Sequence, residues 1–255
     1  MAKFKKTPVA GFLGGLIIIL LSISLGGKLS FFFNLPALLM TIGGSFFASL
    51  VIYDLGTIKN LGSKIYWAFT FEPQDAEPLI ELAKNLAQKV RQDGIMCLEE
   101  EAHKVENSFF RKGVELIIEA ESPEYTQNIL QKEIQSTRKS VQTEIQLLKT
   151  WALLAPAFGL LGGIISLIQL LFHLRYPGQL GAGAATALLP IFYGLIISYL
   201  FCFPLVEKLE LQNERDYLLK TAMLECIMAI QSGLNPRRLE EKLRLLLDLE
   251  VVVDA

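Results

Sequence analysis

The chain has 255 residues, of which 52% are hydrophobic and 20% charged, and its mean hydropathy is +0.41. Soluble globular domains carry about 25% charged residues, so this composition argues against a soluble protein. The net charge of −2 averages two different kinds of segment and does not indicate a partner. The cysteines, Cys97, Cys202 and Cys226, are odd in number and lack CxxC spacing, which argues against a disulfide or metal framework.

The acidic residues avoid two long blocks of the chain. All 26 of them lie in 54–150 or 207–255, and none lies in 1–53 or 151–206. A carboxylate at the centre of a bilayer costs about 3 kcal/mol. The two acid-free blocks are therefore predicted to lie in a membrane.

Four apolar segments in these blocks are long enough to span a bilayer. Hydrocarbon about 30 Å thick needs roughly 20 apolar residues in a helix. The predicted spans are residues 9–25, 35–53, 151–174 and 182–206. The first segment has the basic start of a signal peptide, but no small-x-small cleavage site follows it and a second span comes close behind. We therefore expect a retained helix and two transmembrane hairpins, in 1–53 and 151–206.

Lysine and arginine flank the spans on one side only. The loops inside the two hairpins carry only Lys28 and Arg175. The other flanks carry Lys3, Lys5, Lys6, Lys59, Lys64, Arg138, Lys139, Lys149, Lys208 and Arg215. By the positive-inside rule, both termini and the 54–150 segment are predicted to be cytoplasmic.

The two cytoplasmic segments are predicted to be helical. Residues 77–91 repeat apolar side chains at helical spacing. Ser122 and Pro123 form an N-cap and first position for a helix that runs on into the third span. The tail, 207–255, continues the fourth span, breaks at Ser232–Gly233 and restarts at Asn235–Pro236. The fold class is thus an all-α integral membrane protein with a helical cytoplasmic domain and a helical tail.

Span three carries a face of small residues. Gly159, Gly162, Gly163 and Ser166 are spaced i, i+3, i+4 and i+7. Such a face lets another helix approach closely, and it fits either packing within one subunit or a seat for a partner helix. Ser166 also begins a stripe with Gln169 and His173, which fits an ion path or, for the histidine, an interfacial position without a role.

Span four places Thr186, Pro190 and Tyr193 at i, i+4 and i+7. Pro190 lacks a backbone donor and predicts a kink. The carbonyl that it frees fits contact with an ion or water, or a purely structural role. Neither hairpin has a carboxylate, so conduction through a protonatable site requires an acid from another chain.

Five strings of the sequence occur in the order of one known family. They are Arg91-Gln-Asp-Gly94-Ile-Met-Cys-Leu98-Glu99, Ala155–Gly162, Leu180–Gly194, Pro204–Leu209 and Ser232–Leu243. They resemble, in turn, the cytoplasmic motif, the starts of the third and fourth helices, the end of the fourth helix and the tail of the MotA/PomA family. Each string is weak alone, whereas five in order with matching topology are specific. The shorter ExbB/TolQ relatives fit worse because they lack the first hairpin.

The resemblance implies a stator subunit of an ion-driven flagellar motor in the bacterial inner membrane. It implies a homo-oligomeric ring, a pentamer, around two copies of a single-span MotB-type partner whose helix supplies a membrane Asp. Arg91 and Glu99 would contact a rotor protein of FliG type. Pro156 and Pro204 match family prolines that govern coupling between ion passage and movement. Without the resemblance, the two charges are typical of a solvated surface and the two prolines of helix boundaries.

The sequence departs from the family pattern at three positions. Gly163, Pro190 and Ile191 stand where the family usually has threonine. Sodium prefers oxygen ligands, so this loss favours protons as the driving ion. It also leaves open a non-flagellar member that energises another envelope machine, or a membrane scaffold that no longer conducts. A membrane enzyme is not favoured, because no nucleophile-base or metal spacing occurs around His103 or His173. No cofactor, metal or nucleic-acid partner is expected.

Overall fold

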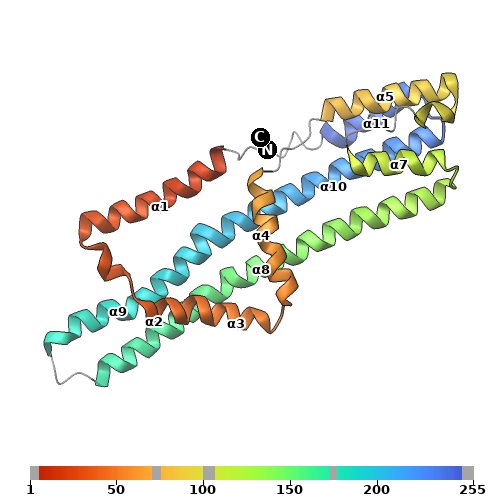
Figure 1. Ribbon diagram of the computed structural model, residues 1–255. Helices are drawn as coiled ribbons and strands as arrows, with labels where there is room; N and C mark the ends of the chain where they lie inside the picture. The colour runs from red at the N-terminus through yellow and green to blue at the C-terminus, as the bar shows by residue number, and fades with distance from the viewer. Residues whose placement is uncertain (1–5, 71–75, 100–106, 173–176, 249–255) are drawn as a thin grey trace. The chain divides into compact units, whose positions relative to one another are not determined.

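The computed structural model describes residues 6–70, 76–99, 107–172 and 177–248, and within these ranges every regular element is helical (Figure 1). Four stretches are long and apolar enough to cross a membrane. They are Val9–Gly26, Leu29–Leu50 and apolar parts of Pro123–Phe172 and Leu180–Gln231. The predicted fold class, an all-α integral membrane protein with four spans, is therefore confirmed.

The first hairpin contains one straight span and one irregular span. Helix α1, Lys6–Gly26, leads into a 3₁₀ turn, Leu29–Phe32. The second span joins α2, Leu35–Leu38, a π-helical turn, Leu39–Gly43, and α3, Gly44–Leu50. It begins at Leu35 because the side chain of Asn34 caps it by accepting a hydrogen bond from the backbone N–H of Ala37, at 3.0 Å. Pro36 fits in the first turn, where a backbone N–H is not needed for the helix.

Helix α8, Pro123–Phe172, contains both the helix predicted from Ser122 and the third span. Its first turn is capped by Ser122, whose Oγ accepts from the backbone N–H of Tyr125 at 3.3 Å. The prediction of one continuous helix is confirmed. The last predicted residues of this span, 173 and 174, lie outside the described residues.

The fourth span changes its helical type midway. Helix α9, Pro177–Leu195, begins at Pro177 rather than at the expected Ala182, because proline is well tolerated at the first helical position. A π-helical segment, Ile196–Cys202, follows, and α10, Phe203–Gln231, continues beyond it. The tail is therefore helical, as predicted, up to Gln231.

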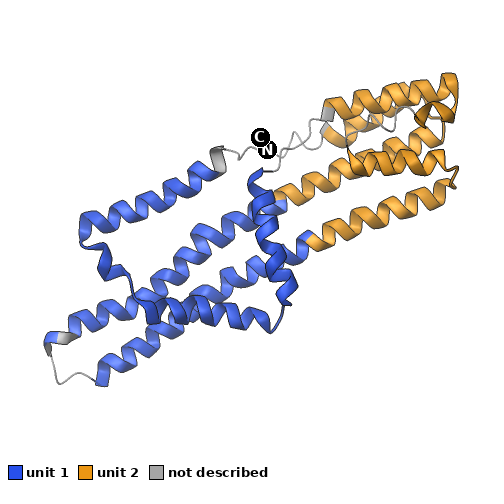
Figure 2. Ribbon diagram, viewed as in Figure 1, with its two compact units in different colours: residues 1–71, 141–210 blue, residues 72–140, 211–255 orange. Residues whose placement is uncertain are grey.

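The chain forms two compact units, which are described separately (Figure 2). Unit 1 comprises residues 1–71 and 141–210 and contains the apolar spans together with α4, Leu55–Thr70. An apolar cluster packs α4 against α8 and α10 through Leu61, Ala68, Val141, Ile145, Leu147, Leu148, Val206 and Leu209. The first span contacts the fourth through the rings of Phe12 and Phe201, whose centroids are 4.5 Å apart.

Unit 2 comprises residues 72–140 and 211–255. It contains α5, Ala76–Asp93, a 3₁₀ turn, Ile95–Cys97, α7, Ser108–Ile118, and α11, Pro236–Asp248. One core joins these helices to the parts of α8 and α10 that belong to the unit. Phe110, Ile227 and Leu239 are fully buried in it.

Helices α5 and α11 pack against each other in unit 2. The predicted amphipathic face of α5 is confirmed, because Leu79, Ala83, Leu86 and Ala87 are buried in the core. Two ion pairs join the polar edges, Arg244 with Glu77 at 2.9 Å and Lys84 with Glu240 at 2.7 Å. Exposed pairs of this kind contribute at most about 1 kcal/mol each, so apolar burial holds this contact.

The break between α10 and α11 follows the predicted signals. Gly233 has a φ of +66°, a left-handed conformation that glycine adopts without steric cost. The Oδ1 atom of Asn235 accepts from the backbone N–H of Arg237 at 3.0 Å and caps α11. The predicted stop at Ser232–Gly233 and restart at Asn235–Pro236 are confirmed.

The backbones of α8 and α9 approach each other at glycines. A Cβ atom added to Gly159 would lie 2.5 Å from the carbonyl oxygen of Pro190 and 3.2 Å from the Cα of Ile191. A Cβ added to Gly163 would lie 3.0 Å from the carbonyl oxygen of Ala187. The small-residue face of span three is therefore packed against span four of the same chain. Of the two alternatives that the sequence leaves open, this is packing within one subunit.

Replacement of Gly159 by alanine is expected to destabilise unit 1. The new methyl group would meet backbone atoms, which cannot rotate away, and such overpacking costs about 1–3 kcal/mol. Gly14→Ala in α1 is the matched control, because a Cβ there meets nothing within 4 Å. Thermal unfolding of the purified variants by circular dichroism should show a lower Tm for Gly159→Ala alone. A Tm equal to that of the control would contradict the close backbone contact.

Glu144 is a buried carboxyl group in α8, before the start of the predicted third span. It is only 3% exposed, and its Oε2 atom has no hydrogen-bond partner. Burial raises the pKa of this carboxyl above its ordinary value, and the positive charge of Lys64 in α4 offsets part of the rise. The folded protein therefore holds this proton more tightly than the unfolded chain does.

Glu144→Gln is expected to stabilise the protein at neutral pH more than at acidic pH. With a raised pKa in the folded state, the ionised carboxylate lowers stability as pH rises above the ordinary glutamate pKa of about 4.3. The Tm gain of Glu144→Gln over wild type should therefore grow between about pH 4 and pH 7. Glu81→Gln, at an exposed position of α5, is the control. A gain that stays constant over this range would contradict the burial effect.

Candidate ion path and partner-helix site

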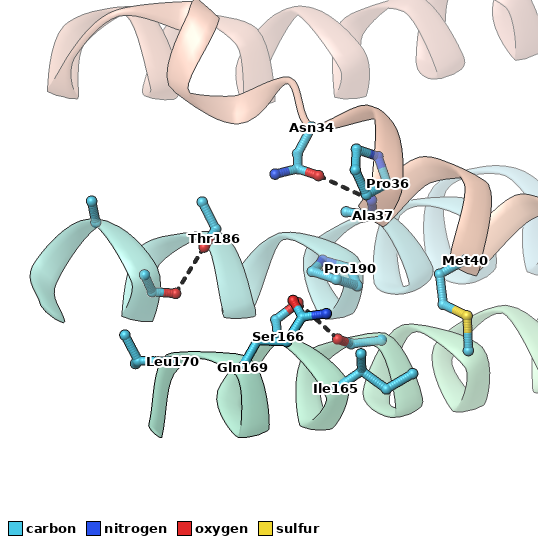
Figure 3. Close-up of a pocket in the computed structure, with 13 residues that line it drawn as sticks. Asn34, Pro36, Ala37, Met40, Ile165, Ser166, Gln169, Leu170, Thr186 and Pro190 are labelled. Carbon is cyan, nitrogen blue, oxygen red and sulfur yellow. Dashed lines mark hydrogen bonds between the residues drawn. The ribbon is translucent and has the colours of Figure 1, made fainter. Parts of the chain in front are cut away.

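A pocket of about 700 Å³ lies among the second, third and fourth spans (Figure 3). Three elements supply its lining: the second span gives Asn34, Pro36, Ala37 and Met40, α8 gives Gly162, Ile165, Ser166, Gln169 and Leu170, and α9 gives Ala182, Gly183, Thr186 and Pro190. Gly162, Ser166, Gln169, Thr186 and Pro190 were predicted from the sequence as site residues. The fold brings them together from two helices.

The polar groups of the pocket are hydroxyls and amides. Ser166 donates its hydroxyl to the carbonyl oxygen of Gly162, at 3.0 Å, and Thr186 donates to that of Gly183, at 2.8 Å. These bonds stay within one helix, and each hydroxyl oxygen can still accept a hydrogen bond. None of the lining residues carries a charge. The pocket can thus accept hydrogen bonds but supplies no group that exchanges a proton near neutral pH.

Tyr193 of α9, another predicted site residue, links α9 to the first hairpin by hydrogen bonds. Its hydroxyl donates to the carbonyl oxygen of Phe32 at 2.5 Å and accepts from the backbone N–H of Asn34 at 2.9 Å. Phe32 ends the 3₁₀ turn and Asn34 caps α2. Tyr193 therefore positions the edge of the pocket, although its side chain is absent from the lining.

Thr41 is a site residue that the sequence reasoning missed. It is fully buried in the π-helical turn of the second span, and its hydroxyl donates to the carbonyl oxygen of Pro190 at 3.2 Å. Thr41, Ser45 and Ser49 follow one another at i, i+4 and i+8, and all three are buried. This hydroxyl stripe on an apolar span is the signal that could have revealed the contact.

The remaining small residues and prolines belong to the contact between spans three and four. Gly159 and Gly163 meet α9, as described above, and a Cβ on Gly162 would lie 2.9 Å from the Cβ of Pro190. Pro156 lies inside α8, and Pro204 lies in the first turn of α10, directly after the π-helical segment. Pro156 therefore lies within a helix and Pro204 within a helical transition.

The two charged residues predicted to contact a rotor belong to unit 2. Arg91 lies in the last turn of α5, and Glu99 follows the 3₁₀ turn Ile95–Cys97. Both are exposed, and Gly94 between them has a φ of +81°, which redirects the chain. His173 lies outside the described residues. Among the residues that the structure describes, no cluster of side chains fits a metal ion.

Comparison with known proteins finds the same family along most of the chain. The model of the MotA/TolQ/ExbB proton channel family matches residues 101–221. Motility protein A of Borreliella burgdorferi is 32% identical over 84% of this chain and 83% of its own length. Chemotaxis protein PomA of Vibrio alginolyticus is 28% identical over 92% of each chain.

A solved structure of the flagellar MotAB stator complex from Bacillus subtilis has the same fold, with a TM-score of 0.88 over 98% of this chain and 99% of that chain, at 24% identity. This likeness covers both hairpins, the helices between them and the tail. The Borreliella burgdorferi relative, at 32% identity over most of both chains, shows the family. The chain belongs to the MotA/TolQ/ExbB proton channel family.

Proposed function

We propose that this chain is the stator subunit of an ion-driven motor and couples cation flow across the inner membrane to rotation of a flagellar rotor. The observation that carries the proposal is the uncharged pocket among three membrane spans. Conducting membrane proteins keep an ionisable group at membrane depth, and this pocket has hydroxyls but no carboxylate. A single-span partner of MotB type, with an Asp in its helix, supplies the missing acid.

The subunit forms a homo-oligomeric ring, a pentamer, around the partner helices. Side chains on the membrane part of α8 support this arrangement, because Leu160, Leu161, Ile164 and Ile168 are exposed in the single chain and need an apolar covering. The lysine and arginine bias around the spans supports cytoplasmic termini. Membership in a proton channel family supports placement in the inner membrane.

Protons are the driving ion in this proposal. Sodium needs several oxygen ligands, whereas a proton needs only an acceptor and an acid. Gly163, Pro190 and Ile191 bring no side-chain oxygen to the positions where the family usually has threonine. The hydroxyls of Ser166 and Thr186 are engaged with carbonyls of their own helices. Each of these hydroxyls can still accept a hydrogen bond from a water molecule, which supports a proton path beside the partner's Asp.

Arg91 and Glu99 contact the rotor, a protein of FliG type. Both side chains are exposed in unit 2, and Gly94 places them on either side of a turn. Two exposed charges of opposite sign suit a partner with complementary charges. Such contacts act on orientation and association rate more than on affinity.

A non-flagellar motor of another envelope machine is the second candidate. It is favoured by the same three departures, Gly163, Pro190 and Ile191. The two candidates share ion flow and differ in their rotor. Restoration of swimming in a stator-deficient flagellated host supports the first, and ion flow without swimming supports the second.

Proton flow is expected when this chain is expressed with its single-span partner after removal of the partner's plug segment. Cytoplasmic pH should fall, and replacement of the partner's membrane Asp by Asn should abolish the fall, because the acid is then lost. The readout is a cytoplasmic pH indicator, with and without external sodium. Influx that follows sodium would overturn the ion assignment. Absence of any flux from an assembled complex would overturn the stator and leave a scaffold.

Charge reversal at the rotor contact is expected to impair swimming without changing ion flow. Arg91→Glu and Glu99→Lys should each reduce swimming speed, because like charges then meet across the contact. Glu81→Lys on an exposed position of α5 is the matched control and should swim normally. Flux through the plug-free complex should equal wild type in all three. Normal swimming by both reversal variants would remove Arg91 and Glu99 from the rotor contact.

A further inference from the structure

The carbonyl oxygen of Ala152 in α8 receives its hydrogen bond from another helix. Pro156, four residues later, has no N–H and cannot donate to Ala152 as an ordinary helical residue would. Ser198, in the π-helical segment of span four, donates its hydroxyl to this oxygen at 2.7 Å. Ser198 and Ala152 are 1% and 2% exposed, so water does not replace this bond.

Ser198 also forms a backbone hydrogen bond next to Pro204. Its carbonyl oxygen accepts from the backbone N–H of Phe203, five residues later, and Phe203 directly precedes Pro204. This longer spacing is the mark of a π-helical turn, a feature that is common at functional sites. The two bonds of Ser198 thus connect Ala152, whose carbonyl Pro156 leaves without its usual donor, to Phe203, the residue before Pro204.

Gly194, one turn before Ser198, brings span four against the same part of α8. A Cβ atom on Gly194 would lie 2.6 Å from the carbonyl oxygen of Ala155 and 2.8 Å from the Cα of Pro156. Gly194 and Ser198 are spaced i and i+4, so they share one face of the helix. Glycine permits the backbone contact, and serine one turn away supplies the donor that Pro156 lacks.

We propose that Ser198 is a positioning residue that holds the part of α8 around Pro156 to the π-helical segment before Pro204, so that these two parts of the spans move together. The Ser198 hydroxyl takes the place of the missing N–H of Pro156. The stability of this bond does not depend on what the protein does. Its use in coupling ion flow to rotation rests on the proposed function.

A double-mutant cycle between Ser198 and Pro156 tests the bond in the purified complex. Ser198→Ala leaves the Ala152 carbonyl buried without a donor and should lower the Tm by roughly 3–8 °C. Pro156→Ala restores an N–H to α8, so Ser198→Ala in that background should lower the Tm much less. Ser49→Ala is the control, because Ser49 is equally buried but bonds within its own helix. An equal fall in both backgrounds, or none, overturns the proposal.

A second pair of variants keeps the test decisive if Pro156→Ala does not assemble. Threonine and valine at position 198 have the same shape and differ only in the hydroxyl. Ser198→Thr should keep a higher Tm than Ser198→Val, because only threonine can donate to Ala152. Equal Tm values for this pair overturn the proposal.

The same pair tests coupling in cells. Ser198→Thr should support swimming, whereas Ser198→Val should lose swimming speed while the plug-free complex still conducts. Equal swimming by the two variants overturns the positioning role. Absence of flux from the wild-type complex would instead overturn the proposed function, and the Tm cycle would still report on the bond. The two failures are therefore distinguishable.

Discussion

In the second hairpin, the backbones of α8 and α9 touch at Gly159, Gly163 and Gly194. Backbone contact of this kind requires small residues, since any Cβ would push the helices apart. The pocket lies beside this contact and takes residues from the same two helices. The glycines therefore set how closely the two helices approach beside the pocket, while the polarity of its α8 and α9 walls comes from Ser166, Gln169 and Thr186.

The bilayer imposes a second requirement on these helices. Backbone groups in hydrocarbon have no water to bond with, so each must find a partner within the protein. Pro156 removes one such partner, and the hydroxyl of Ser198 replaces it. Thr41 adds a similar bond to the Pro190 carbonyl from the second span. Hydroxyl groups on one helix thus meet carbonyl groups on another at two of the prolines, which joins the second, third and fourth spans.

Much of the architecture was accessible from the sequence because its causes are local. The acid-free blocks gave the spans, the periodicity of α5 gave its buried face, and Gly233 with Asn235 gave the break before α11. Each of these signals arises within a few neighbouring residues. Helical spacing also identified Gly162, Ser166 and Gln169 on span three, and Thr186 and Pro190 on span four, as candidate site residues, but it did not show that the two sets line one pocket.

The contacts across helices were not accessible in this way. Glycine spacing on α8 indicates that something approaches closely, but it does not distinguish a helix of the same chain from a partner's helix. Thr41 and Pro190 are 149 residues apart, and no local pattern pairs them. Ser198 was overlooked for a related reason. Its hydroxyl donates to the Ala152 carbonyl on another helix, which lacks its usual donor because Pro156 has no N–H.

The two bonds of the Tyr193 hydroxyl have a consequence for the order of assembly. They join α9 to Phe32 and Asn34, about 160 positions earlier in the chain. Membrane spans emerge from the ribosome in chain order, so the first hairpin reaches the bilayer long before Tyr193 has been synthesised. Until the fourth span has been inserted, the 3₁₀ turn and the cap of α2 lack the hydrogen bonds to Tyr193. The final arrangement of the earliest spans is thus completed by the last one to insert.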